Sequence, residues 1–160
     1  MLFRILKMRF YIFNEGRVML CIGREARVPD VLPTGVACEA VRLFVESNKE
    51  VCYMGCCSLE ELPEGYEWMD LRESFHVLPE AEYRMAGKAS ELLYFDRLHR
   101  YCGLCGAPME WSSAISKRCT QCGDEIWPKL NTAIIVLIHR GEEALLVKAK
   151  NFRRDYYGLV

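Results

Sequence analysis

The sequence predicts an α+β protein in three successive parts: a small mixed N-terminal domain with a long helix, a zinc ribbon with four cysteine ligands, and a C-terminal β-hairpin. Three observations lead to this prediction. Short apolar runs broken by turn residues fill the first part, a longer segment shows helical periodicity, and two CxxC pairs follow it. We place the domains at residues 1–98, 99–127 and 128–160.

The N-terminal domain is expected to be built mainly from strands. Runs rich in β-branched and aromatic residues predict four strands, at residues 3–13, 17–22, 50–54 and 67–71. Turns that contain glycine or proline separate these runs. Residues 36–46 are predicted to form a short helix.

A long helix is predicted over residues 79–100. Pro79 fits the first turn of a helix, and Glu80 and Glu82 suit its positive N-terminal end. Apolar residues then recur near helical spacing as far as Leu98. We expect this helix to pack on the sheet and to lead the chain into the ribbon.

The two CxxC pairs predict a metal site. Cys102 and Cys105 form the first pair, Cys119 and Cys122 the second, and 13 residues separate them. Zn²⁺ favours four thiolates in a tetrahedron, and four protein ligands leave no open position for water, so this zinc is expected to be structural. Two disulfides or two redox dithiols are the alternative, but the doubled pattern and an intracellular context favour the metal.

Other side chains with ligand chemistry are interpreted without a metal. His99 precedes the first pair and is able in principle to bind zinc, yet with four cysteines available we interpret it as a capping or surface residue. The five remaining cysteines are expected to be reduced thiols, mostly in the core. Cys56 and Cys57 are adjacent, but no matching pair or histidine is near them in sequence, so we predict no second metal site.

Composition limits the cellular context. Arg4, Lys7 and Arg9 interrupt the apolar N-terminus, which excludes a signal peptide of the usual form, and no apolar stretch approaches the roughly 20 residues of a membrane span. The net charge of −1 gives no electrostatic footprint for nucleic acid. We therefore expect a soluble, cytoplasmic protein without membrane contact.

The C-terminal part predicts a β-hairpin. An apolar strand is expected at residues 132–138, a turn at 139–143 and a second strand at 144–149. Both faces of the first strand should be buried, yet only residues 151–160 remain to cover it. Either a further domain or a partner subunit is expected to supply the cover.

An ordered series of motifs runs from the helix to the end of the chain. It consists of Leu98-His99-Arg100-Tyr101 before the first CxxC pair, the second pair, Trp127-Pro128 and the apolar Ala133-Ile134-Ile135-Val136. This series resembles the NADH pyrophosphatase, or NAD(+) diphosphatase, family of Nudix hydrolases. The resemblance covers about residues 71–160, and residues 1–70 stand where that family has a variable N-terminal domain.

The resemblance implies a hydrolase that splits the pyrophosphate bond of NAD(H), and in some members of NAD-capped RNA, into nicotinamide mononucleotide and AMP. In that family Mg²⁺ or Mn²⁺ ions, held by glutamates of the Nudix box, assist the reaction. The box is absent here, so the hairpin is expected to open an incomplete Nudix domain and the chain alone to be inactive. We assign no catalytic residue, and because family members commonly form homodimers we expect one here.

Two residues are assigned to substrate binding by the same resemblance. Trp127 stands where the family has an aromatic residue that stacks on a base of the dinucleotide, and Ile135 stands on a strand that lines this pocket. Packing between ribbon and hairpin explains Trp127 equally well, and a core position is the alternative for Ile135. Glu142 and Glu143 are paired carboxylates, but they stand in the predicted turn and are interpreted as solvated.

A module that binds nucleic acid or a protein partner without chemistry is the second functional hypothesis. Zinc ribbons often serve this purpose, and phosphate contacts are open to five basic residues near the ribbon, namely Arg97, Arg100, Lys117, Arg118 and Lys129. A solvated surface is the alternative for these residues. Salt-dependent binding of RNA or DNA would favour the module.

Overall fold

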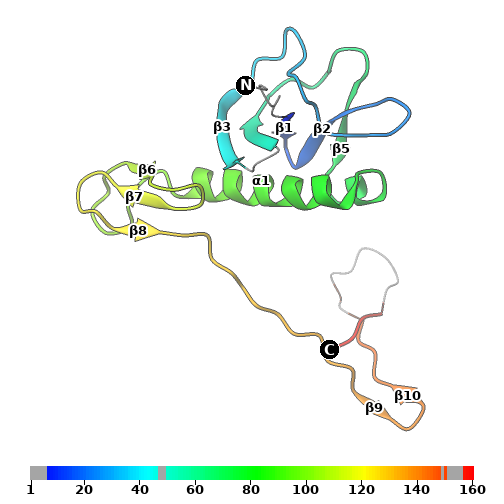
Figure 1. The fold of residues 1–160 in the computed structure, drawn as a ribbon. Helices are drawn as coiled ribbons and strands as arrows, with labels where there is room; N and C mark the ends of the chain where they lie inside the picture. Colours follow the sequence, from blue (N-terminus) through cyan, green and yellow to red (C-terminus); the bar gives the residue numbers. More distant parts are fainter. Residues whose placement is uncertain (1–6, 47–49, 149, 151–156) are drawn as a thin grey trace, which may run out of the picture. The chain divides into compact units, whose positions relative to one another are not determined.

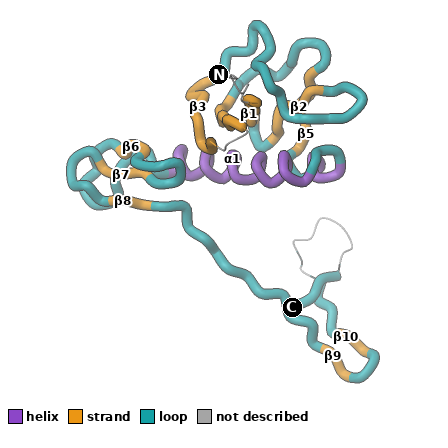
Figure 2. Tube along the Cα trace, in the orientation of Figure 1, coloured by secondary structure: helices purple, strands orange, loops and turns teal. Residues whose placement is uncertain are grey.

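The computed structural model describes residues 7–46, 50–148, 150 and 157–160. They fall into two compact units, Met1–Pro128 and Lys129–Val160, each of which is described by itself. Within the described ranges the first unit contains a five-stranded sheet, one α-helix and a three-stranded sheet, and the second contains a two-stranded hairpin (Figures 1 and 2). This arrangement confirms the α+β class.

The five-stranded sheet has the order β3-β4-β1-β2-β5. Strand β1 pairs in parallel with β4, and the other neighbours are antiparallel. The four predicted strands are confirmed in the described residues, although residues 3–6 of the first prediction lie outside them. The bounds are β1 Lys7–Asn14, β2 Arg17–Cys21, β3 Glu39–Glu46, β4 Glu50–Cys56 and β5 Tyr66–Asp70.

The prediction of a short helix over residues 36–46 is wrong. Residues Glu39–Glu46 form β3, which pairs antiparallel with β4 at the edge of the sheet. In the sequence, Val41, Leu43 and Val45 recur at a period of two, and β-branched residues favour an extended backbone. Two register shifts interrupt the pairing of β3 with β4, so β3 is less regular than the other strands.

The predicted long helix is confirmed. Helix α1 spans Glu80–Leu98, with Pro79 as the residue before its first turn and His99 as the residue after its last. The carbonyl of Pro79 accepts a hydrogen bond from the Tyr83 N–H at 3.0 Å, which starts the helix. A 3₁₀-helix, η1 Glu73–His76, precedes it. In the described part of the chain, no helix combines the length and hydropathy that a membrane crossing requires.

Both faces of the five-stranded sheet are covered. Along β1, Tyr11 and Phe13 belong to a core cluster with the buried face of α1, whereas Ile12 between them belongs to a second cluster with Val36 and Cys57. Figure 1 shows α1 running along the first of these faces. The helix contributes buried residues to that cluster, namely Ala86, Ala89 and Leu92. The sheet therefore holds α1 firmly where it leads into the ribbon.

The three-stranded sheet of the first unit is the ribbon. Its antiparallel strands are β6 Met109–Trp111, β7 Lys117–Cys119 and β8 Glu125–Ile126, with β7 in the middle. Its own core is small: Cys102, Met109 and Cys119 are buried, with Ala107 and Ile126 packed against them. So few apolar residues do not stabilise a fold without further links.

The second unit contains less strand than predicted. Strands β9 His139–Arg140 and β10 Glu143–Ala144 flank a two-residue turn in which Gly141 has a φ of 58°. The predicted strand over residues 132–138 is wrong, because the described residues provide no continuous partner for it. Its apolar side chains are exposed, Ile134 at 83% and Ile135 at 80%. The cover expected for this segment stays a prediction.

Candidate metal centre and its attachment to the helix

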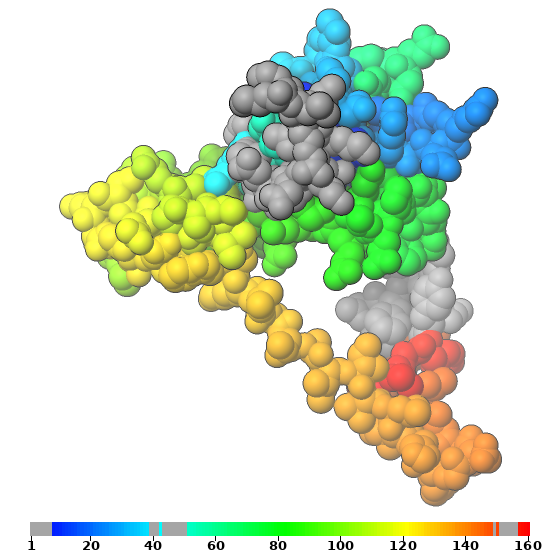
Figure 3. Space-filling model, in the orientation of Figure 1, coloured from blue at the N-terminus to red at the C-terminus, as the bar shows by residue number. Residues whose placement is uncertain are grey.

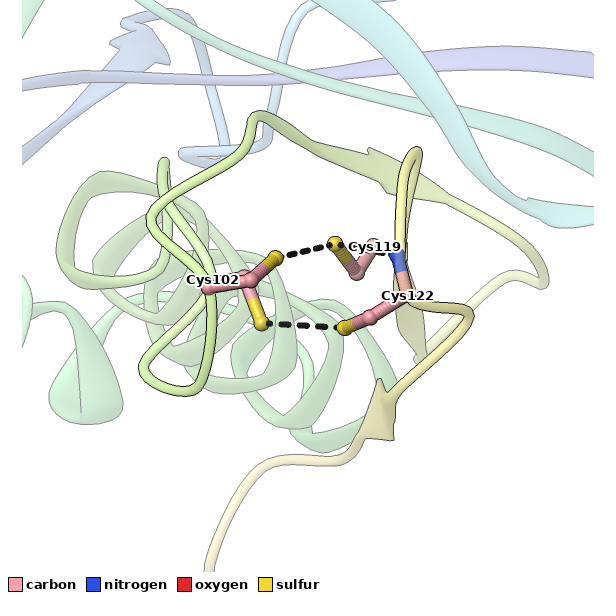
Figure 4. A group of neighbouring side chains, drawn as sticks. Cys102, Cys119 and Cys122 are labelled. Atoms are coloured by element: carbon pink, nitrogen blue, oxygen red, sulfur yellow. Dashed lines mark hydrogen bonds between the residues drawn. The ribbon is translucent and has the colours of Figure 1, made fainter.

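The four predicted cysteines come together at one end of the ribbon. The Sγ atoms of Cys102, Cys105, Cys119 and Cys122 all lie within 4.8 Å of one another. Cys102 contacts Cys122 at 3.6 Å, and Cys105 contacts Cys119 at 3.4 Å. Figure 4 shows the sulfurs of Cys119 and Cys122 directed toward the turn that carries Cys102, with a dashed line between Cys102 and Cys122. Among the described residues this is the one group of three or more metal-binding side chains.

The backbone of each CxxC turn is directed toward a sulfur. The N–H of Leu104 donates to Cys102 Sγ at 3.4 Å, and the N–H groups of Gln121 and Cys122 donate to Cys119 Sγ at 3.4 Å. Gly106 and Gly123 follow the pairs with φ values of 77° and 75°, a conformation that favours glycine and turns the chain back. Such amide donors orient thiolates for a metal.

These hydrogen bonds divide the thiols into unequal acids. The Cys122 N–H, helped by the Gln121 N–H and by neighbouring thiols, lowers the pKa of Cys119 to about 6. For Cys122 the Asp124 N–H favours the thiolate, but the hydrogen bonds with Cys119, Cys105 and Cys102 outweigh it and raise the pKa to about 12. Four sulfurs this close repel one another as thiolates, so the donor set fits a divalent cation with four soft ligands, which is the chemistry of Zn²⁺.

His99 belongs to the helix end, as its interpretation as a capping residue requires. Its Nδ1 lies 2.9 Å from the carbonyl oxygen of Phe95, and its ring contacts the Phe95 ring at 4.6 Å between centroids, with the two planes tilted by 38°. It is not one of the four side chains grouped around the metal position.

A carboxylate fastens the strands of the ribbon to one another. Glu125 accepts hydrogen bonds from Ser112 Oγ at 2.5 Å, from Ser116 Oγ at 2.8 Å and from Arg118 Nη2 at 2.6 Å. The hydrogen bond of Ser112, followed by those of Arg118 and Ser116, lowers the pKa of Glu125 to about 2 from an ordinary 4.5. The charged form is therefore stabilised in the folded ribbon.

This depressed pKa gives a testable pH dependence. The stabilisation by Glu125 is complete above pH 4.5 and is lost as the pH falls toward 2, because over this range the unfolded state binds a proton that the folded state does not. We expect Glu125→Gln to lower the melting temperature at pH 6 and to remove part of the decline in stability between pH 4.5 and about 2. Glu110→Gln, an exposed change on neighbouring β6, is the matched control. Equal pH profiles for the two variants would contradict this role.

A buried lysine joins the ribbon to α1. Lys117 of β7 is 3% exposed, and its Nζ donates to Asp96 Oδ1 at 2.8 Å and to the His99 carbonyl at 2.7 Å. Lys117 is paired with Trp111 across β6 and β7, and its Nζ lies 5.7 Å from the centre of the Trp111 ring, over which the guanidinium of Arg42 lies at 3.8 Å. In Figure 3 the ribbon, in yellow-green and yellow, lies directly against the green end of the helix. Sequence reasoning missed this link, because its partners are 21 residues apart.

The link changes the interpretation of the basic residues near the ribbon. Lys117 is buried and Arg118 is paired with Glu125 at 2.6 Å, so neither is free to contact a phosphate. Arg97, Arg100 and Lys129 are exposed. The five residues therefore do not form one basic surface.

The two residues assigned to substrate binding lie in different units. Trp127 belongs to the first unit, directly after β8, and is 54% exposed. Ile135 belongs to the second unit and is 80% exposed. Their roles stay predictions.

The remaining cysteines are partly as expected. Cys52 and Cys57 are buried, Cys21 and Cys38 are partly buried, and Cys56 is exposed. The structure places Cys38 in hydrogen-bond contact with Cys57, and burial followed by the charges of Cys57 and Cys56 raises the pKa of Cys38 to about 11. This contact was missed because Cys38 precedes β3, which the sequence had suggested was helical.

This chain is similar to curated proteins named NAD-capped RNA hydrolase NudC. The protein from Deinococcus radiodurans is 35% identical over 135 residues, which are 82% of this chain and 46% of the relative. That from Chromobacterium violaceum is 27% identical over 150 residues, 93% of this chain and 56% of the relative. This chain thus spans about half the length of the curated relatives it matches.

Two family models match in succession. The NADH pyrophosphatase zinc ribbon domain matches residues 97–126, which contain the four clustered cysteines. The NADH pyrophosphatase-like rudimentary NUDIX domain matches residues 7–94, and so gives an identity to the N-terminal residues that the motifs had left unassigned. Because this second match covers more than half of the sequence and continues into the ribbon, the chain belongs to the NADH pyrophosphatase family of Nudix proteins.

Proposed function

We propose that this chain is the N-terminal and zinc-ribbon part of an NAD(+) diphosphatase. Such an enzyme hydrolyses the pyrophosphate bond of NAD(H) to nicotinamide mononucleotide and AMP, and that of NAD-capped RNA to nicotinamide mononucleotide and 5′-phosphorylated RNA. The domain order carries the proposal: a rudimentary NUDIX domain at 7–94 leads, two residues later, into a zinc ribbon at 97–126. The names of the relatives support NAD-capped RNA as a substrate.

In this proposal Cys102, Cys105, Cys119 and Cys122 hold one structural Zn²⁺. Their mutual distances within 4.8 Å and the amide donors around Cys119 support it. Four thiolates leave no position for a reacting water, so the ion serves folding, on the order of 10 kcal/mol for such sites. The ribbon, with its small core, is the part of the molecule that most needs this energy.

The chemistry of hydrolysis is proposed to come from the whole protein. The sequence from Met1 to Val160 contains no Nudix box, so glutamates that hold Mg²⁺ or Mn²⁺ are expected in a further segment, and the chain alone is expected to be inactive. Trp127 supports a role in substrate binding, since its half-exposed indole has a face available for stacking on a base. The proposal includes Ile135 in the same pocket.

Assembly and location complete the proposal. A homodimer is supported by the exposed apolar residues of the second unit, such as Ile134, which require a cover. A cytoplasmic location is supported by the four clustered thiols, because thiols persist in a reducing compartment.

The decisive experiment is to read the gene beyond the codon for Val160 and to assay the product of the whole frame. We expect a Nudix box after Val160 and release of reduced nicotinamide mononucleotide and AMP from NADH in the presence of Mg²⁺ or Mn²⁺. The 160-residue chain, assayed beside it, should release neither product. A stop codon directly after Val160, or a whole product that leaves NADH intact, would refute the hydrolase.

A further inference from the structure

A cavity of about 520 Å³ lies between the five-stranded sheet and the C-terminal half of α1. The sheet contributes the turn between β1 and β2 and the residues after β4. Polar or aromatic side chains from both sides line it, among them Asn14, Ser58, Ser90, Tyr94, Arg97 and Arg100. Neither the metal centre nor the residues assigned to the dinucleotide belong to this cavity.

The cavity opens at the carboxyl ends of two neighbouring parallel strands. Strands β1 and β4 run in parallel, and Phe13 and Cys56 form the last pair of their register. Beyond that pair the Cys57 N–H donates to the Phe13 carbonyl at 2.8 Å, which continues the pairing up to the residues that line the cavity. Sheets of mixed α/β architecture commonly bind ligands at this edge.

The charges in the cavity favour an anion. Arg97 and Arg100 are exposed, and in the described part of the chain neither is in a salt bridge. Two carboxylates also line the cavity, but Asp96 is compensated by Lys117 at 2.8 Å. The cavity is therefore lined by two guanidinium groups and by one carboxylate, that of Glu15, without a salt bridge in the described residues.

An aromatic ring stands beside these guanidinium groups. Tyr94 is 56% exposed, and the guanidinium of Arg97 lies 5.5 Å from the centre of its ring. Exposed aromatic rings and arginines together recognise unpaired bases and their phosphates in single-stranded RNA. Asn14 is held in place at the back of the site, because its side-chain amide donates to the Leu59 carbonyl at 2.9 Å.

We propose that this cavity binds single-stranded RNA, with one base on Tyr94 and the adjoining phosphates on Arg97 and Arg100. The hydroxyls of Ser58 and Ser90 and the amide of Asn14 supply neutral partners for the ribose. This inference rests on the proposed function, and it names the part of the molecule that would hold the RNA body behind the NAD cap. Of the five basic residues named for nucleic-acid binding in the second functional hypothesis, this proposal uses two, Arg97 and Arg100.

The test is binding of a fluorescent, uncapped single-stranded RNA to the 160-residue chain, followed by anisotropy at several salt concentrations. We expect Arg97→Ala combined with Arg100→Ala to weaken binding roughly tenfold and to reduce the salt slope by about 0.7 per arginine. Tyr94→Ala should weaken binding at least about fivefold at every salt concentration. All three side chains are exposed, so these variants should keep the wild-type melting temperature.

Matched controls come from the same helix and from the residues just after it. Lys88→Ala removes an exposed charge from α1, and Tyr101→Ala removes an exposed aromatic ring just beyond it, but neither residue lines the cavity. Both control variants should bind RNA as the wild type does. Equal losses in controls and test variants, or no loss in the test variants, would overturn the proposal.

Two further arms separate the ligand classes and the two proposals. Competition with AMP and with inorganic phosphate should displace the RNA only at far higher concentration than unlabelled RNA, and equal potency of AMP would overturn RNA as the ligand. Binding is measured without hydrolysis, so the two proposals can fail separately. If the whole protein splits NADH but its RNA binding is unchanged by the substitutions of Arg97 and Arg100, this inference alone is refuted. RNA binding that depends on them, together with an inactive whole protein, refutes the proposed hydrolase alone.

Discussion

Replacing Cys102 with serine is expected to release the metal and to unfold the ribbon. Cys102 is buried and supplies one of four sulfurs that lie within 4.8 Å of one another, and a serine hydroxyl is a poor zinc ligand. The loss of binding free energy is on the order of 10 kcal/mol, far more than the small ribbon core provides. Zinc content measured by atomic emission should fall from one ion per chain toward none.

The damage should be confined to the ribbon. The larger core, in which Leu92 packs on the sheet, contains none of the four sulfurs, so amide exchange should accelerate in β6, β7 and β8 but remain slow in β1 and β2. Trp127, directly after β8, should lose its native emission because the strand that holds it is released.

A second cysteine provides the control for this substitution. Cys56→Ser changes an exposed thiol that is no member of the metal group. It should keep full zinc content and the wild-type exchange pattern. A Cys102→Ser protein with unchanged zinc content and melting temperature would show that the cluster does not hold the ion.

Features with a local signal could be predicted from the sequence. Helix α1 was found almost to its last residue, because Pro79, the acidic first turn and the apolar spacing all lie within one segment. The metal group was found because each CxxC pair is a local turn and the spacing of the two pairs is typical of a ribbon.

Features that depend on a distant partner could not be predicted. Strand β3 is extended because β4 pairs with it, and its own sequence does not decide between strand and helix. The prediction for residues 132–138 failed in the opposite direction. Their composition is typical of a strand, but the described residues supply no continuous partner strand. The cavity beside Arg97 needs both the order of the sheet and the position of the helix, neither of which composition contains.

The contact of Lys117 with Asp96 belongs to the same class. In the sequence Lys117 is one of several basic residues near the ribbon and has the pattern of a surface side chain. In the structure it is 3% exposed and is the main polar link between β7 and the end of α1. The removal of either partner therefore has a cost that sequence composition would not suggest.

We expect the two partners of this ion pair to respond unequally to mutation. Asp96→Ala leaves the ammonium of Lys117 buried with the His99 carbonyl as its remaining partner, which costs about 3 kcal/mol. Lys117→Met removes the charge but keeps an apolar side chain of similar length opposite Trp111 in the register of β6 and β7, and Asp96, whose side chain is 38% exposed, regains water. The second change should therefore cost about 1 kcal/mol. Urea unfolding at pH 7 measures both values.

The double variant decides whether the cost arises from an unpaired buried charge. When Asp96→Ala is added to Lys117→Met, no ammonium is left to desolvate, so the double variant should be more stable than Asp96→Ala alone by about 1–2 kcal/mol. Arg84→Ala, which breaks the exposed pair with Glu80 on the same helix, should change stability by less than about 0.5 kcal/mol and serves as the control. If Lys117→Met proves the more damaging single change, or if the two costs add, then Lys117 stabilises the junction through its packing and its charge carries no part of the link between ribbon and helix.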